Sequence, residues 1–197
     1  MRLLAAVPIK ALDEAKSRLQ EEDVDRGRLT LAMLDRVLDA IHASRAVNGI
    51  VVVSPDPDVL RHVESRATPV LQRTSGLNEA AEEAAMWAVC DGADALLIVH
   101  GDLPWLTPED VSSMRSLADE GTVVLAPDRA EKGTNMLLAS PPAAIHYKFG
   151  PDSFARHQSE ARAEGLHVRM YRSESAARDV DTAEDLAACM PLLATCR

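Results

Sequence analysis

Aromatic residues are scarce in this sequence, since phenylalanine, tryptophan and tyrosine together account for 3% of its 197 residues. Apolar residues as a whole still make up 47% of the chain, so we expect a core built mainly from leucine, valine, alanine and isoleucine. A chain of this length buries roughly 70% of the surface that its unfolded form exposes, and it therefore needs no disulfide or structural metal to fold. We expect a single domain over residues 1–197.

Cysteines and long apolar runs are also scarce. The cysteines Cys90, Cys189 and Cys196 are widely spaced and show no Cys-x-x-Cys or Cys/His pattern, which argues against zinc and against a disulfide framework. We expect Cys90 and Cys189 to be small buried apolar residues. No run of about 18 apolar residues could span a membrane, and the first seven residues are too few for a signal peptide. The sequence therefore predicts a cytoplasmic protein.

Positive charge is in deficit, because the formal net charge is −10. An acidic surface argues against nucleic-acid or membrane partners, which are themselves polyanionic. Small anionic ligands need only a local cluster of cations or a bound metal, so they remain compatible with this charge. The sequence also lacks the GxxxxGK[ST], GxGxxG, GxSxG and HExxH motifs, which removes support for P-loop kinases, Rossmann dehydrogenases and the common hydrolases.

Short apolar runs alternate with segments of helical periodicity along the whole chain. Strands are predicted at 3–7, 50–53, near 70, and at 95–99, 123–126, 136–139 and 166–171. Helices are predicted from about 31, between 57 and 70, from 78 to about 90, from 107, from 152 to 164, and from 182. This alternation predicts a three-layer α/β domain with a mostly parallel, doubly wound sheet. Ligands in such sheets bind beyond the carboxyl ends of the strands.

Three cations follow the first predicted strand within nine residues, namely Lys10, Lys16 and Arg18. Arginine as a planar fork and lysine as a point charge are suited to hold the phosphates of a nucleotide. The alternative is a solvated loop with ordinary surface cations, and spacing alone slightly favours this alternative.

Three aspartates follow other predicted strands. Asp102 comes directly after the strand at 95–99, where a carboxylate often holds a phosphate-bound magnesium ion, although it also fits a turn. Asp179 and Asp181 are two residues apart, so in an extended chain both carboxylates point to the same side. Together the three would form an oxygen-only site, which suits Mg²⁺. Part of this run also reads as a helix start, because Thr182 precedes Asp185 by three residues.

Two further segments carry candidate anion-binding groups. Residues 132–135, with Thr134, precede an apolar strand, and residues 149–157 place Gly150 and Ser153 at an apparent helix start. Free N–H groups and a hydroxyl at such a position suit a carboxylate or phosphate, although a plain turn and N-cap explain the pattern equally well. We interpret His157 as an ordinary helix-face residue, and Asn78 as an N-cap. We interpret His100 as a packing residue or one that supports a ligand from behind.

Taken in order, these segments resemble a known family. The segments VPIK…AKSRL, GLNEA, GDLPWL, KGTNMLL, FGPDSFARH and DVDTAEDL are similar to the 2-phospho-L-lactate guanylyltransferase family, including its bacterial phosphoenolpyruvate guanylyltransferase branch. These enzymes serve biosynthesis of the deazaflavin coenzyme F-420. The resemblance runs from about Val7 to Leu186 and implies a nucleotidyltransferase fold related to the GT-A, nucleotide-diphospho-sugar transferase type.

The resemblance also implies a reaction and a set of roles. GMP would pass from GTP to a small phosphorylated acid, with release of pyrophosphate and with Mg²⁺ as cofactor. By motif match, the magnesium ligands would be Asp102, Asp179 and Asp181; the acid would contact Thr134, Gly150 and Ser153; the nucleotide would contact Lys10, Lys16, Arg18 and Asn78; and the catalytic groups would be Lys16, Arg18 and Asp102.

Several alternatives stay open at this point. The acid is 2-phospholactate, phosphoenolpyruvate or 3-phosphoglycerate, and preference for guanine rests on the resemblance alone. Two other hypotheses are a nucleotidyltransferase of the same fold that acts on a sugar phosphate or a molybdopterin-type cofactor, and a non-catalytic nucleotide-binding protein. Lys132 and His100 depart from the residues expected beside the GTN and GDLP motifs. A homodimer is compatible with the sequence but is not indicated by it.

Overall fold

The computed structural model describes residues 1–13 and 25–194. Within these residues, seven strands form one sheet in the order β3-β2-β1-β4-β6-β5-β7. The strands are β1 (Leu3–Pro8), β2 (Gly49–Ser54), β3 (Thr68–Leu71), β4 (Ala95–Val99), β5 (Thr122–Pro127), β6 (Thr134–Ser140) and β7 (His167–Met170). Only β6 runs against its neighbours, being antiparallel to both β4 and β5. The mostly parallel sheet predicted from the sequence is therefore confirmed.

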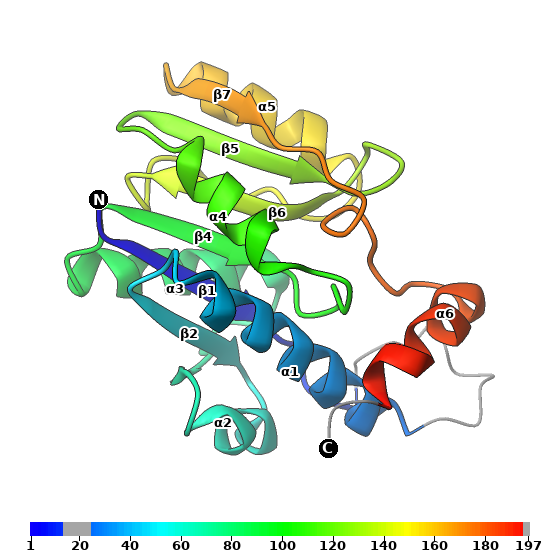
Figure 1. Ribbon diagram of the computed structural model, residues 1–197. Coiled ribbons are helices and arrows are strands. Elements are labelled where there is room, and N and C mark those ends of the chain that lie inside the picture. The colour runs from blue at the N-terminus through cyan, green and yellow to red at the C-terminus, as the bar shows by residue number, and fades with distance from the viewer. Residues whose placement is uncertain (14–24, 195–197) are drawn as a thin grey trace.

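Helices cover both faces of the sheet, which gives the three layers that the sequence predicts (Figure 1). In the described residues they are α1 (Arg26–Ser44), α2 (Pro57–Val63), α3 (Leu77–Cys90), α4 (Pro108–Ser116), α5 (Ser153–Ala163) and α6 (Ala183–Leu193). Buried side chains of α1, α2 and α4 share one core cluster with one face of the sheet. Those of α3 and α5 share a second cluster with the other face.

The central strands are buried on both faces, as expected for parallel strands that helices sandwich. Every residue of β1 and β4 is buried, so their continuous apolar runs replace the alternating pattern of a half-exposed strand. Leucine, valine and alanine dominate these cores, as the scarcity of aromatic residues predicts. The described residues contain no helix that is long and apolar enough to cross a membrane.

Two predicted helix starts are confirmed, and one is corrected. Thr107 and Thr182 each form a capping box with an aspartate three residues later, at the starts of α4 and α6. The N-cap of α3 is Gly76 rather than Asn78, which lies inside the helix. The Asn78 side chain has other partners, described below, so it is not available to cap this helix.

The cysteine predictions have different outcomes. Cys189 is fully buried between α6 and α1, as predicted. Cys90 is exposed, which corrects its expected burial. The buried stripe of α3 consists of alanines up to Ala88, and Cys90 is the last helical residue outside that stripe. Cys196 lies outside the described residues.

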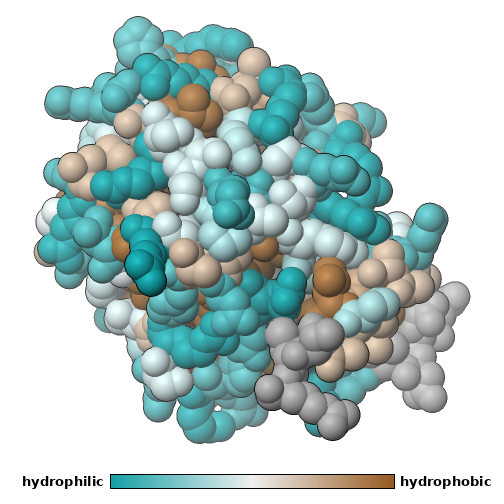
Figure 2. All heavy atoms as spheres, in the orientation of Figure 1, coloured by the Kyte–Doolittle hydropathy of each residue, from teal (hydrophilic) through white to brown (hydrophobic). Residues whose placement is uncertain are grey.

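After β7 the chain follows the carboxyl edge of the sheet through residues 171–181, here called the strap, and enters α6 (Figure 1). Helix α6 lies beside the amino-terminal end of α1. There Leu186 of α6 packs against Leu29 and Met33 of α1. Hydrophilic residues predominate on the face seen in Figure 2, and hydrophobic residues appear there only in small patches. That surface agrees with the content of charged residues, which make up 26% of the chain.

Candidate active site

The candidate residues meet at one edge of the sheet. The parallel strands β1 and β4 both end there, and the antiparallel β6 begins there, with Val99 opposite Met136. The N–H of His100 donates to the carbonyl of Asn135 at 3.1 Å, which joins the exit of β4 to the start of β6. Asp102 and Thr134, which are far apart in the sequence, therefore lie on neighbouring chain segments at the carboxyl edge, where ligands of such sheets bind.

The loop that carries Asp102 packs directly on the exit of β1. A Cβ atom on Gly101 would lie 2.2 Å from Cδ1 of Ile9, so the loop passes close to this side chain, and a larger residue would require the end of Ile9 to move. Ile9 is buried and Lys10, the next residue, is exposed. The approach brings the chain that bears the predicted nucleotide contact Lys10 against the chain that bears the predicted metal ligand Asp102.

The strap reaches the same loop. The N–H of Val180 donates to the carbonyl of Asp102 at 3.2 Å, and the Val180 side chain is fully buried. Its neighbours Asp179 and Asp181 are half-buried. If this segment is extended, alternation would put both carboxylates on the side opposite Val180. We call Asp102, Asp179 and Asp181 the metal-side aspartates.

These aspartates do not form a closed metal cage. Within residues 1–13 and 25–194, no three side chains of histidine, cysteine, aspartate or glutamate are grouped so that they could hold a metal ion. Magnesium, however, usually keeps several waters and takes one or two carboxylates together with substrate phosphates. The adjacent loop and strap therefore fit an ion that arrives with the nucleotide better than a preformed protein site.

Sequence reasoning missed the residue that anchors the strap. Asp110 is 1% exposed, and its carboxylate accepts hydrogen bonds from the hydroxyls of Tyr171, Ser173 and Ser175 as well as from Thr107. Burial opposes ionisation, but the hydrogen bonds from Ser173, Ser175 and Thr107 outweigh it and hold the pKa of Asp110 below its ordinary value. The capping pattern Thr107–Asp110 was visible in the sequence, whereas the contacts with the strap depend on tertiary structure.

Three side chains form a buried polar cluster, here called the acceptor cluster and defined as Thr134, Ser153 and His157. The Ser153 hydroxyl donates to Oγ1 of Thr134 at 3.4 Å, and Nδ1 of His157 lies 3.0 Å from the same atom. All three residues are at most 2% exposed. The structure therefore brings together two of the residues predicted to contact the acid, and it adds His157, whose hydrogen bonds sequence reasoning missed.

The third predicted acid contact, Gly150, is exposed and lies three residues before the start of α5. Its φ of 111° lies in a region that side-chain-bearing residues rarely adopt. The N–H of Ser153 donates to the Gly150 carbonyl at 3.1 Å, and that of Phe154 donates to Lys132 at 3.0 Å. Two of the N–H groups that were expected to receive an anion are thus already bonded within the protein.

The turn before Thr134 is fixed by Asp128, which accepts the N–H groups of Lys132 and Gly133 at 2.9 and 2.8 Å. A Cβ atom on Gly133 would lie 2.6 Å from the Asp128 carboxylate, so a larger residue would require the carboxylate that holds this turn to move. The exposed Lys132, noted as a departure from the family pattern, lies at the rim of this turn.

Asn78 holds the other side of the acceptor region. Its side-chain amide donates to the Phe149 carbonyl at 3.2 Å and accepts the Phe149 N–H at 2.6 Å. The side chain that the resemblance assigned to the nucleoside is thus engaged with the main chain. The Phe149 ring packs against His100 at 5.1 Å and against His157 at 4.8 Å between ring centroids, so His100 does make a packing contact, as one of its two interpretations expects.

The predicted phosphate-binding residues Lys16 and Arg18 lie outside the described residues. Just before them, the N–H of Leu12 donates to Asp56 at 2.9 Å. That hydrogen bond is the main cause of the lowered pKa of Asp56, which also caps α2. The chain that leaves β1 is therefore tied to the start of α2 at the carboxyl edge.

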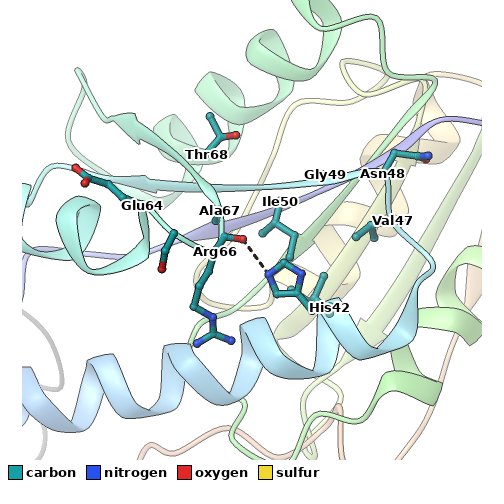
Figure 3. A pocket seen from close by; sticks show the side chains of 11 residues that line it. His42, Val47, Asn48, Gly49, Ile50, Glu64, Arg66, Ala67 and Thr68 are labelled. Carbon is teal, nitrogen blue, oxygen red and sulfur yellow. Dashed lines mark hydrogen bonds between the residues drawn. The ribbon is translucent and has the colours of Figure 1, made fainter.

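A hollow of about 450 Å³ lies elsewhere, between the end of α1 and the starts of β2 and β3 (Figure 3). It is at the amino edge of the sheet, opposite the residues described above. Its one arginine, Arg66, pairs with Asp35 and Asp39, so its charge is already balanced. Neither its position nor its charge suits a phosphate-transfer site.

Comparison with known proteins gives a consistent result. A family model described as guanylyl transferase CofC like matches residues 1–191. A phosphoenolpyruvate guanylyltransferase from Sphaerobacter thermophilus is 44% identical over 189 residues, covering 94% of this chain and 91% of that protein. A 2-phospho-L-lactate guanylyltransferase from Methanothermobacter thermautotrophicus is 35% identical over 190 residues, covering 94% and 83%.

Solved structures extend the similarity of the fold. A nucleotidyl transferase from a Methanothermobacter species matches with a TM-score of 0.76 and 13% identity, covering 100% of this chain and 99% of that one. At this identity the likeness concerns the fold alone, and it confirms the nucleotidyltransferase fold that the resemblance implies.

Proposed function

The chain belongs to the guanylyl transferase CofC-like family, and from that premise we propose that it transfers GMP from GTP to phosphoenolpyruvate and releases pyrophosphate. We favour phosphoenolpyruvate over 2-phospholactate as the proposed acceptor, because the relatives at 44% and 42% identity are named phosphoenolpyruvate guanylyltransferases. The relative named for 2-phospho-L-lactate is 35% identical. The proposal includes a place in coenzyme F-420 biosynthesis and a cytoplasmic location.

One observation carries this proposal. The hydroxyls of Thr134 and Ser153 meet at 3.4 Å, and residue 135 is bonded to residue 100 in the loop of Asp102. The predicted acid site and the predicted metal site are therefore neighbours at the carboxyl edge of one sheet. A transfer between two anions needs this adjacency, because its barrier comes largely from charge repulsion and positioning.

The reaction is an in-line displacement at phosphorus. A phosphate oxygen of the acid attacks the α-phosphorus of GTP and forms a new P–O bond, while the bond from that phosphorus to the bridging oxygen of the β-phosphate breaks. The electron pair leaves with pyrophosphate. The attacking phosphate is already anionic at neutral pH, so no strong general base is required. Thr134, Gly150 and Ser153 would orient the acid, and Lys10, Lys16 and Arg18 would bind the triphosphate.

Asp102, with Asp179 and Asp181, would hold Mg²⁺ together with the nucleotide. The bound ion would supply neutralisation of the negative charge on the reacting phosphates. Carboxylates suit this hard cation, and the hydrogen bond between Val180 and Asp102 keeps the loop and the strap side by side. Asn78 would act on the acid side of the site, since it holds the main chain of Phe149.

Pyrophosphate release is the direct test. Each of the four nucleoside triphosphates would be paired with phosphoenolpyruvate, 2-phospholactate and 3-phosphoglycerate in the presence of magnesium. We expect turnover with GTP and phosphoenolpyruvate, and mass spectrometry of the product should show the guanylyl diphosphate ester. Turnover with GTP and another acid would replace the proposed acceptor. Failure of every combination, with protein shown to be folded and to bind GTP, would overturn the proposed reaction.

A further inference from the structure

His157 is a fully buried histidine in α5 that makes two hydrogen bonds inside the acceptor region. One bond joins it to the main chain of Lys148, shortly before Gly150, and the other joins it to Thr134 at the start of β6. It therefore links the two segments that are proposed to contact the acid.

The first bond determines which ring nitrogen carries the proton. A backbone N–H can only donate, so Nε2 of His157, at 2.9 Å from the Lys148 nitrogen, must be unprotonated. A neutral imidazole then carries its proton on Nδ1, and Nδ1 donates to Oγ1 of Thr134 at 3.0 Å. The main chain of Lys148 thus selects the tautomer.

The ring also stays neutral. Burial, followed by the charges of His100, Arg156 and Lys148, lowers the pKa of His157 to about 3. Glu160 approaches from the same helix and pairs with the Lys148 side chain, so its charge is shared with that lysine. The Nδ1–H donor is therefore present at every pH at which the enzyme is expected to work.

The Thr134 hydroxyl has one hydrogen to donate and two lone pairs that can accept hydrogen bonds. Its oxygen accepts from Nδ1 of His157 and from the Ser153 hydroxyl, and these two bonds use both of its lone pairs. Its own hydrogen is still to be donated, and no group in the described parts of the chain accepts it. A buried hydroxyl usually completes its hydrogen bonds, so this hydrogen is available to an acceptor outside the protein, such as a ligand or a water.

We infer that His157 is a positioning residue of the acid site, which acts through Thr134 by fixing its hydroxyl hydrogen as a donor to an anionic oxygen of the acid. The inference rests on the proposed function and deepens it. The inference also requires that the ligand group bound by the Thr134 hydroxyl be a hydrogen-bond acceptor. A carboxylate or phosphate oxygen satisfies it, and a neutral donor group does not.

Two conservative substitutions separate the two hydrogen bonds of His157. In His157→Asn the side-chain amide can take the place of Nδ1 and keep a donor to Thr134, but the Lys148 N–H loses its partner. In His157→Gln the amide reaches the place of Nε2 and can keep the bond to Lys148, but the donor to Thr134 is lost. A role confined to packing would affect both variants alike, and a role confined to anchoring Lys148 would raise the acid's KM in His157→Asn but not in His157→Gln; either result would overturn the inference.

The kinetic test compares KM for phosphoenolpyruvate with KM for GTP. We expect His157→Gln to raise the KM of the acid about tenfold and to leave that of GTP within about twofold, as for loss of one hydrogen bond to a charged group. His157→Asn should keep the acid's KM within about threefold of the wild-type value, whatever its loss of thermal stability. His167→Gln, on the exposed edge strand β7, is the matched control and should change neither constant.

A double-mutant cycle tests whether His157 acts through Thr134. Thr134→Val removes the hydroxyl and should raise the acid's KM by itself. Adding His157→Gln to that variant should then raise it no further, whereas independent effects would multiply. Multiplication of the two effects, or equal effects of the Asn and Gln variants on the acid's KM, would overturn the inference.

A measurement without turnover reads the tautomer. Nitrogen-15 NMR of the wild-type protein should show one histidine with a protonated Nδ1 and an unprotonated Nε2, whose signals disappear in His157→Gln. The opposite tautomer, or a charged ring at neutral pH, would overturn the inference by itself. A wild-type protein that is inactive in every substrate pair would instead overturn the proposed function, and the acid's position beside Thr134 with it.

Discussion

The metal-side aspartates and the acceptor cluster lie next to each other, yet they differ in burial and in charge. The aspartates are half-buried carboxylates on a loop and a strap, whereas the side chains of the acceptor cluster are neutral and at most 2% exposed. The acceptor cluster already makes hydrogen bonds within the protein. The metal-side aspartates are not grouped as a metal cage within the described residues.

This difference follows from the free energy of burying each kind of group. A buried carboxylate cluster without its cation is strongly destabilising, whereas neutral hydroxyls and an imidazole can be buried if they bond to one another. On the proposed assignment, the acid site can be built in advance, whereas the metal site would be completed by the ion and the nucleotide. Substitution of a metal-side aspartate should therefore lower turnover most. Substitution in the acceptor cluster should instead weaken the affinity for the acid.

The largest effect is expected from Asp102→Ala. Loss of this carboxylate removes a proposed ligand of the ion that neutralises the reacting phosphates, so turnover at saturating substrates should fall about a thousandfold or more. Thermal unfolding should change little, because Asp102 is half-buried on a loop. Glu174→Ala, which alters an exposed acidic residue of the strap, is the control and should keep wild-type turnover. Near-normal turnover of Asp102→Ala with magnesium would refute the metal assignment.

The second effect concerns stability. It tests whether the contacts of Asp110 with the strap stabilise the protein beyond the contribution of an ordinary helix cap. Asp110→Ala leaves three strap hydroxyls and a helix N-terminus without their shared acceptor, and it should lower the free energy of unfolding by about 3 kcal/mol. Asp185→Ala removes the equivalent capping aspartate of α6, which accepts from Thr182 and, over a long 3.4 Å, from the main-chain N–H of Asp181 at the end of the strap, and it should cost about 1 kcal/mol. Urea unfolding measures the loss of unfolding free energy in each variant. Equal losses in Asp110→Ala and Asp185→Ala would mean that the strap contacts of Asp110 contribute nothing to stability.

Much of this architecture was predictable from local sequence. The strand at 95–99 was placed at its observed bounds, and the capping residues Thr107 and Thr182 located two helix starts, because both signals depend on neighbouring residues. Cys90 and Asn78 were misjudged for a different reason. The outer face of an alanine-rich helix, and the pairing of Asn78 with Phe149 across 71 positions, depend on tertiary structure.

The candidate site divides in the same way. Motif resemblance selected Thr134 and Ser153, which the fold does bring together. The segment FGPDSFARH also contains His157, but it was interpreted as an ordinary helix-face residue, because a single histidine on a helix looks alike whether it is buried or exposed. The contacts between Asp110 and the strap were equally hidden, since they join residues about 60 positions apart. Long-range hydrogen bonds leave no local pattern in a single sequence.

The third prediction uses pH to test the burial of the acceptor cluster. The pKa of His157 is about 3 in the folded protein and near 6.5 when unfolded, so between these values only the unfolded chain binds the proton. Stability is therefore fully present above the unfolded pKa and falls as the pH is lowered, by about 1.4 kcal/mol per unit between about pH 6 and about pH 4. His157→Gln lacks this contribution, so urea unfolding at several pH values should show the difference in stability from the wild type changing by that slope. A constant difference would mean that the ring is charged or solvated in the folded state.

The smallest effect is expected from Ser153→Ala, on the acid side of the site. Ser153 donates to Thr134 over 3.4 Å, a long hydrogen bond, so its loss should raise the KM of phosphoenolpyruvate about fivefold. Turnover at saturation and the KM of GTP should stay within about twofold, in contrast to Asp102→Ala. Ser159→Ala, an exposed serine in the same helix, serves as the control. If Ser153→Ala raised both Michaelis constants equally, Ser153 would not distinguish the acid from the nucleotide, and the division between the two sides of the site would be lost.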